Sequence, residues 1–537
     1  MKPSLLFVNG VIHPMSGERP VSALAVRDGR VAAAGGRDEC ARALGPDYQV
    51  CDLAGACLTP GFIDTHLHPL MFISYHMQVR LDGAKNAREA AQRMAHAAAL
   101  RQPGQWVVGV DLDENGFDLP ELPDGGLLDE ACPANPAVMV RHCGHLAVVN
   151  RAALAAAGID DACSDPARGS LDRDRRGRLT GVLREEAVGL VTGCLPLPSP
   201  DELARGAKAA AQDLFSRGIT TLGAVIQSGD FGPLGVAGGL EPLLLGALRQ
   251  AFPLNLRALV FARTDAEFHR AVALTACGEP PDAVCLAGVK LIADGSFGAR
   301  TAALWDDYTD APGNRGMLHY HDRELVAAVE WAHAQGLLVA VHAIGDKACR
   351  QVVDAFATVL ARHPAKEHGL RMEHASLLSP SLVEDLARLD IGVSTQPMFI
   401  HSEKHWLKAR LGSRTPWVYP LRSLVEAGVP VAGASDAPVE SPDVVAAIAC
   451  SVTREGFETH QTLSPRQALE MYTCQAARLV RGQGSVGAFV PGARADLAVL
   501  SADPLAVATQ DLSAIKVRRT YLAGRLVYDA DNAWETT

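Results

Sequence analysis

Residues 60–68 read Pro-Gly-Phe-Ile-Asp-Thr-His-Leu-His, and this segment carries the strongest fold signal in the chain. Its apolar first half is typical of a buried strand, and His66 and His68 stand at the end of that strand. Alternate residues of a strand point to the same side, so both imidazoles can reach one metal ion. Two unrelated polar side chains at a strand end are the alternative. Strand candidates and ligand-type residues elsewhere in the sequence distinguish between these interpretations.

Short apolar segments of the same kind recur along the chain, separated by Ala-rich stretches with helical character. Including the first, the strand candidates are 58–65, 219–225, 254–261, 286–293, 337–342, 370–374, 391–395 and 429–434. Eight short strands that alternate with helices are the pattern of a (β/α)8 barrel. The sequence therefore predicts an α/β protein with a TIM barrel.

Two parts of the chain depart from the barrel pattern. Roughly 150 residues separate the first two strand candidates, where about 30 are usual for one βα unit. This spacing predicts an inserted cap at about residues 70–205. Residues 1–57 and 485–537 instead contain short strands and turn pairs such as Asn9-Gly10. We expect both ends to form one composite β-sandwich domain, with the barrel spanning residues 58–484.

The composition excludes several classes of function. The 537 residues carry a formal net charge of -11, so no basic surface is expected that could neutralise the phosphates of a nucleic acid. No stretch approaches the about 20 apolar residues of a membrane span, and the N-terminus lacks a signal-peptide core. The 12 cysteines show no CxxC pairs. We expect reduced thiols in a cytoplasmic protein.

More residues with metal-ligand chemistry stand at the ends of other strand candidates. His342 and His374 each close an apolar run, and Asp436 follows the last strand candidate. Active sites of barrel enzymes lie at the C-terminal ends of the strands. Lys290 lies inside the apolar run 284–293, although lysine is rarely buried without a partner. The sequence predicts one metal site from six residues, namely His66, His68, Lys290, His342, His374 and Asp436.

Lys290 has two interpretations. Burial lowers the pKa of a lysine, and a neutral amine can react with carbon dioxide to give a carbamate whose oxygens bridge two metal ions. The alternative is a structural ion pair with Asp294 or Asp436.

The order His-x-His, Lys, His, His, Asp along a predicted barrel resembles that of the amidohydrolase superfamily. Residues 289–304, VKLIADGSFGARTAAL, are similar to the lysine segment of the large amidohydrolases that include N-substituted formamide deformylases. Residues 484–487, GSVG, and 491–497, PGARADL, resemble the return into the β-sandwich of that family. The resemblance covers nearly the whole chain.

The resemblance implies an enzyme that cleaves a carbon–nitrogen bond of the amide or formamide type with metal-activated water. Zinc fits the nitrogen and oxygen donors best, and iron or manganese is the alternative by ligand type. We expect two ions, the first held by His66, His68 and Asp436 and the second by His342 and His374. Carboxylated Lys290 would bridge them, and one ion is the alternative. Asp436 would take the proton of the water and deliver it to the leaving nitrogen.

Two further residues are candidate substrate contacts. Residues 141–150, RHCGHLAVVN, look like a Gly-His segment in the insertion of that family and single out His145, although the family usually has Asp where Cys143 stands. A structural role for His145 is the alternative. Arg300 could grip a substrate carboxylate, whereas pairing with a neighbouring Asp is its structural alternative.

Two other functions remain open. A mononuclear enzyme acting on a cyclic amide, a deamination substrate or an ester would bind a single zinc ion. A non-catalytic binding relative should have lost ligands, whereas all six positions are filled here. A small-molecule substrate is the expected partner, with neither nucleic acid nor membrane. A homodimer is considered, but no sequence feature decides the oligomeric state.

Overall fold

The computed structural model describes residues 4–17, 19–114, 117–119, 121–141, 146–166, 169–228, 235–261, 265–276 and 284–531. The chain divides into two compact units, which are described separately. The first contains Met1–Phe72 and Lys208–Thr537, and the second contains Ile73–Ala207. Among the described residues, no helix combines the length and the apolar character needed to cross a bilayer.

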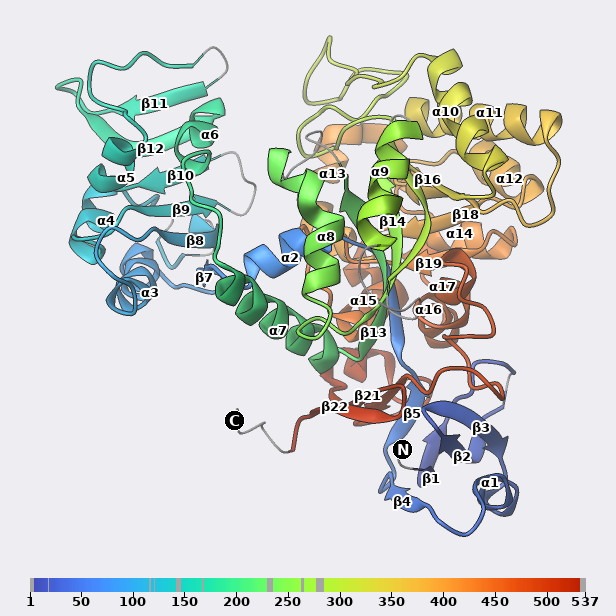
Figure 1. The fold of residues 1–537 in the computed structure, drawn as a ribbon. Helices are drawn as coiled ribbons and strands as arrows, with labels where there is room; N and C mark the ends of the chain where they lie inside the picture. The colour runs from blue at the N-terminus through green and yellow to red at the C-terminus, as the bar shows by residue number, and fades with distance from the viewer. Residues whose placement is uncertain are drawn as a thin grey trace. The chain divides into compact units, whose positions relative to one another are not determined.

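The barrel lies in the first unit and, within the described residues, consists of eight parallel strands in chain order (Figure 1). They are β6 (Phe62–Leu67), β13 (Ile219–Gln227), β14 (Asn255–Phe261), β15 (Val284–Ile292), β16 (Leu338–Ala343), β17 (Leu370–His374), β18 (Gly392–Thr395) and β19 (Val431–Gly433). The segment after β19 returns to β6, because Asp436 N donates to His66 O at 2.8 Å and His68 N donates to Ala437 O at 3.0 Å. These bonds nearly close the ring and confirm the predicted (β/α)8 class.

Helices follow the barrel strands. They include α8 (Glu241–Ala247), α9 (Asp265–Ala276), α10 (Asp322–Ala334), α11 (Asp346–Arg362), α12 (Pro380–Arg388), α13 (Met398–Leu411), α14 (Leu421–Glu426), α15 (Val444–Thr453), α16 (Pro465–Met471) and α17 (Cys474–Leu479). Helix α11 buries Val352, Phe356 and Val359, which recur at the spacing of one helical face. Helix α12 begins with Ser379 as its cap and Pro380 in its first turn, as helix-start preferences predict.

Strands from both ends of the chain form a second sheet in this unit, the terminal sheet. Its described strands are β22 (Arg525–Asp529), β21 (Val517–Leu522), β20 (Leu497–Leu500), β5 (Cys57–Pro60), β1 (Leu5–Ile12), β2 (Val21–Arg27) and β3 (Arg30–Gly35), in that order, with β4 (Gln49–Asp52) paired to β1. Strand β5 pairs with β1 on one side and with β20 on the other. The chain then passes through Gly61 into β6. A Cβ at Gly61 would lie 2.4 Å from Thr220 Oγ1, so only glycine fits this close approach.

The second unit is inserted between β6 and β13, as predicted. Its described sheet has the order β11 (Gly169–Arg173), β12 (Leu179–Glu185), β10 (Leu146–Val149), β9 (Ala137–Arg141), β8 (Val107–Leu112) and β7 (Val79–Arg80). The helices α3 (Ala87–Ala99) and α4 (Gly125–Ala131) pack on it through Met94 and Leu128. Asn150 accepts hydrogen bonds from Ala137 N and from Ala153 N, so it links β9 to the start of α5 (Arg151–Ala156).

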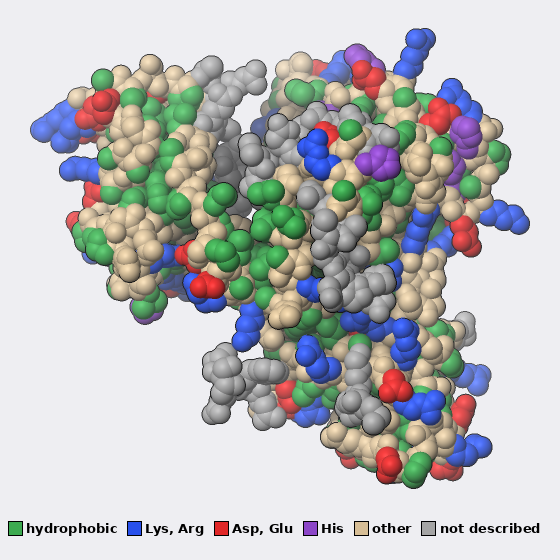
Figure 2. All heavy atoms as spheres, viewed as in Figure 1, with side chains coloured by type: hydrophobic (Ala, Val, Ile, Leu, Met, Phe, Trp, Pro, Cys, Tyr) green, Lys and Arg blue, Asp and Glu red, His purple; other side chains and the backbone are tan. Residues whose placement is uncertain are grey.

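Charged side chains on the surface are of mixed sign. Figure 2 shows basic and acidic side chains of the described residues interspersed over the face in view. That face therefore presents no continuous basic surface of the kind that binds a phosphate backbone.

Candidate metal centre

The six predicted ligand residues all belong to the first unit and lie at or near the C-terminal ends of barrel strands. His66 belongs to β6, Lys290 to β15, His342 to β16 and His374 to β17, whereas His68 follows β6 and Asp436 follows β19. This is the end of the barrel at which such enzymes carry their active sites.

Three of these residues converge on one point. Ligand atoms of His66, His374 and Asp436 all lie within 4.8 Å of one another, and all three side chains are buried. Asp436 Oδ1 lies 3.3 Å from His66 Nε2 and 3.2 Å from His68 Nε2. Burial acts to raise the pKa of Asp436, but His66 and His68 lower it well below its usual range. The carboxylate therefore stays ionised, as a metal ligand must be.

The hydrogen bonds of the imidazoles orient them for metal binding. His66 Nδ1 donates to Glu373 Oε2 at 2.5 Å, and His374 Nδ1 donates to Gln396 Oε1 at 2.8 Å. His342 uses its other nitrogen, Nε2, to donate to Gly295 O at 2.9 Å. In a neutral imidazole, the nitrogen opposite the donor carries the lone pair, which a metal needs. Burial lowers the pKa of His66 to about 4 and that of His374 well below its usual value, so both are neutral.

Lys290 is 3% exposed, as its apolar sequence context predicts. Burial lowers the pKa of its amine to about 8, although the charges of Glu373 and Asp436 oppose this shift. Within the described residues, no ion pair joins Lys290 to Asp294 or Asp436. Part of the Lys290 population is therefore neutral near pH 7 to 8, and the neutral amine is the form that reacts with carbon dioxide.

A buried ion pair that was not predicted from the sequence lies behind the histidines. Glu373 is fully buried and accepts from Arg371 Nε at 2.5 Å as well as from His66. Arg371 also donates to Thr65 O at 2.9 Å and to Leu479 O at 3.0 Å. The available signal was an Arg and a Glu two residues apart inside an otherwise apolar strand, because buried charges require partners.

Two buried aspartates hold the backbone around the site. Asp64 accepts from His66 N at 3.1 Å and from Ser435 N at 3.1 Å, so it links the first and last strands. Burial raises the pKa of Asp64 to about 7. Asp294 accepts from three backbone N–H groups, those of Ala303, Ile344 and Gly345, at 2.8 to 3.0 Å. These bonds fix the loop after β15 against the end of β16, which carries His342.

Arg300 forms an ion pair with the neighbouring Asp310. Its Nη2 donates to Asp310 Oδ2 at 2.8 Å and its Nε to Asp310 Oδ1 at 3.1 Å. Arg300 thus adopts the arrangement expected for its structural alternative. The other substrate candidate, His145, lies outside the described residues.

A cavity of about 710 Å³ opens at the opposite end of the barrel strands. It is lined by Leu338, Leu370 and Gly392, each the first residue of its strand. Because barrel chemistry takes place where the strands end rather than where they begin, this cavity is separate from the metal centre.

Neutral imidazoles and an ionised carboxylate that meet where barrel strands end are typical of metal-dependent hydrolases. The sequence profile of the Amidohydrolase family matches residues 49–528. The chain therefore belongs to the amidohydrolase family, which confirms the resemblance found in its motifs.

Individual relatives are similar over almost their full lengths. The chain is 29% identical over 534 residues to putative amidohydrolase YtcJ of Bacillus subtilis, covering 97% of this chain and 98% of the relative. It is 26% identical over 542 residues to N-substituted formamide deformylase of Arthrobacter pascens, covering 98% of each. A solved structure of an uncharacterized metal-dependent hydrolase from Pyrococcus horikoshii has a TM-score of 0.74 and 27% identity, covering 94% of this chain and 99% of that one.

Proposed function

We propose that this member of the amidohydrolase family is a zinc enzyme that hydrolyses an amide or formamide bond of a small molecule. A metal-dependent hydrolase of carbon–nitrogen bonds is the class to which its family and its relatives point. The observation that carries the proposal is the cluster of His66, His374 and Asp436, whose ligand atoms lie within 4.8 Å of one another.

The donor set fits zinc. Imidazole nitrogen and carboxylate oxygen are both common zinc ligands. His66, His68 and Asp436 would hold one ion, His342 and His374 a second, and carboxylated Lys290 would bridge the two. When bound, zinc polarises the substrate carbonyl and lowers the pKa of water, so that water can attack at neutral pH.

Asp436 moves the proton in this mechanism. It is ionised, and its Oδ1 lies 3.3 Å from His66 Nε2 and 3.2 Å from His68 Nε2. From this position the carboxylate can accept a proton from the attacking water and deliver it to the departing nitrogen. Glu373 keeps the proton of His66 on Nδ1 and thereby keeps Nε2 available as a ligand.

Lys290 contributes through its lowered pKa. Its neutral amine would attack carbon dioxide, forming an N–C bond and releasing one proton, to give a carbamate with a single negative charge. The carbamate would therefore place a negative charge, where a protonated lysine would carry a positive one, beside the proposed zinc ions. Burial among the ligands supports this role.

The substrate class rests on one relative. The Arthrobacter pascens protein bears the name N-substituted formamide deformylase, which favours N-substituted formamides as first substrates for this chain. His145 remains a proposed substrate contact. The described cysteines are free thiols, which supports a cytoplasmic enzyme.

A substrate panel tests the proposal. Metal-depleted protein should hydrolyse N-alkyl formamides or N-acyl amines only after zinc and bicarbonate are added. Lys290→Ala should lose this activity and regain part of it with a short carboxylate such as propionate, which can replace the carbamate. Lys516→Ala serves as the control, because Lys516 is an exposed lysine directly before β21. If zinc-loaded and bicarbonate-treated protein hydrolyses no member of the panel, the proposed function is wrong.

A single-ion enzyme is the competing mechanism, and metal analysis of the same samples separates the two. Two zinc ions bound by the barrel, with activity that responds to bicarbonate, support the bridged centre. A single zinc ion bound by the barrel, together with activity that does not change when bicarbonate is added, contradicts the bridged centre.

A further inference from the structure

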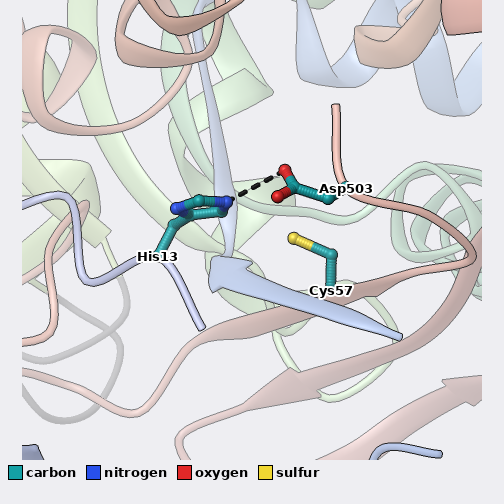
Figure 3. A group of neighbouring side chains, drawn as sticks. All are labelled: His13, Cys57 and Asp503. Carbon is teal, nitrogen blue, oxygen red and sulfur yellow. Dashed lines mark hydrogen bonds and ion pairs between the residues drawn. The ribbon is translucent and has the colours of Figure 1, made fainter. Parts of the chain in front are cut away.

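A second group of potential ligands lies in the terminal sheet, away from the barrel centre. Ligand atoms of His13, Cys57 and Asp503 all lie within 4.8 Å of one another (Figure 3). His13 Nε2 lies 2.9 Å from Asp503 Oδ1. Cys57 and His13 are buried, and the side chain of Asp503 is 16% exposed.

Neighbouring strands bring these three residues together. His13 directly follows β1, Cys57 begins β5, and Asp503 comes shortly after β20. In the sheet, β5 lies between β1 and β20, and Cys57 is paired with Val11 on one side and Leu500 on the other. The backbone on both sides of Cys57 is therefore fixed by strand pairing, so the cluster does not depend on a flexible loop alone.

We propose that His13, Cys57 and Asp503 form a zinc site that is separate from the metal centre of the barrel. One imidazole nitrogen, one sulfur and one carboxylate oxygen are all donors that zinc accepts, and three protein ligands leave a fourth position for water. That position would face outward beside Asp503, the most exposed of the three. This proposal does not depend on the proposed hydrolase function.

The charges in the cluster balance with a divalent cation. A thiolate and a carboxylate together carry two negative charges, which match those of zinc, while His13 binds as a neutral ligand. Without a cation, burial and the nearby charge of Asp503 raise the pKa of Cys57 well above its usual value, so the thiol keeps its proton. Zinc would replace this proton and release it to solvent.

The geometry favours a metal site over a nucleophilic Cys-His-Asp relay. A relay needs a reachable thiol, and the histidine has to contact the thiol and the carboxylate through different ring nitrogens. Cys57 has no solvent exposure. Figure 3 shows its sulfur on the side of His13 that bears Nε2, the nitrogen bonded to Asp503. The three donors thus face a common point.

A zinc ion here would tie the two ends of the chain to β5. His13 and Asp503 are 490 positions apart in sequence, and each lies next to a strand that pairs with β5. A link that closes so long a loop removes conformational freedom mainly from the unfolded chain. Binding energy at such a site is also folding energy.

Cobalt(II) substitution tests the site, because a thiolate ligand gives cobalt a sulfur-to-metal charge-transfer absorption in the near ultraviolet. None of the proposed barrel ligands contains sulfur, so this absorption would report the new site alone. Wild-type protein saturated with cobalt should show the band. Cys57→Ser should lose the band and one equivalent of metal, and it should keep the barrel metal.

Cys40→Ser is the matched control, since Cys40 is equally buried and packs against the same sheet. It should keep both the band and the metal equivalent. Asp503→Asn changes a partly exposed ligand without emptying the core, and it should weaken cobalt binding at this site at least tenfold. The proposal is overturned if cobalt-saturated wild type shows no band, or if Cys57→Ser keeps the band at full intensity.

Discussion

Glu373→Gln should weaken metal binding at the barrel centre more than its small change in shape suggests. Glu373 accepts from His66 Nδ1 and from Arg371 Nε, both at 2.5 Å. A glutamine that keeps its carbonyl towards Arg371 turns its NH₂ group towards His66. Nδ1 must then accept, and the proton of the imidazole moves to Nε2, the nitrogen that faces Asp436.

The magnitude has two parts. Loss of an outer partner of a metal-binding histidine typically costs 10- to 100-fold in metal affinity, or about 1.4 to 2.7 kcal/mol. Arg371 is buried and would lose its carboxylate partner, and breaking a buried ion pair typically costs about 3 to 5 kcal/mol of stability. We therefore expect weaker zinc binding and a lower melting temperature in the same variant.

Competition with a chromophoric chelator measures the zinc dissociation constant, and circular dichroism measures the melting temperature. Glu330→Gln is the matched control, because Glu330 also pairs with a histidine and an arginine, His363 and Arg362, but on the surface. It should change neither quantity appreciably. If Glu373→Gln lowers the melting temperature but leaves zinc affinity within twofold of wild type, Glu373 serves only as a counter-ion for Arg371 and the tautomer argument fails.

Three further outcomes are expected. Burial raises the pKa of Glu241 to about 7, above the 4.5 of the free side chain, so the folded protein binds more protons than the unfolded chain between these values. The stability of wild type relative to Glu241→Gln should therefore fall by about 3 kcal/mol as the pH rises from 4.5 to 7. An unchanged difference in melting temperature between pH 5 and 7.5 would contradict this. Gly61→Ala should destabilise the protein by about 1 to 3 kcal/mol, because the new Cβ would meet Thr220 Oγ1; Thr220→Ala should restore part of the loss in a denaturant titration. Prolonged chelation should abolish hydrolysis of the formamide panel and zinc should restore it, whereas activity that survives verified metal removal would refute a metal-dependent mechanism.

The barrel could be predicted because its strands are short, apolar and regularly spaced. Residues 370–374 were predicted as a strand and form β17 with the same limits, whereas β19 is shorter than the predicted 429–434. Strand ends are also where ligand-type residues stand out, so the place of His342 and His374 at the ends of β16 and β17 could be predicted from the sequence, and their role as ligands stays a prediction. Local pattern was sufficient for these features.

Residues that act through distant partners could not be assigned in this way. Glu373 supports His66 from a position 307 residues away, and Asp64 binds Ser435 from 371 residues away. The residues next to Glu373 and Asp64 in sequence do not indicate which distant residue each one contacts, since pairing across the barrel depends on its closure. The cluster of His13, Cys57 and Asp503 was missed for the same reason, because three strands of one sheet have to pair before its members meet.

Strand β5 has a consequence for how the protein is made. It leads through Gly61 directly into β6, which presents His66, and its antiparallel neighbour β20 spans Leu497–Leu500. A ribosome synthesises the histidine pair early but the neighbour of β5 more than 400 residues later. The growing chain therefore carries β5 with an unpaired edge through most of translation, the kind of edge that invites aggregation. Shielding of this edge by a chaperone would matter most during that interval.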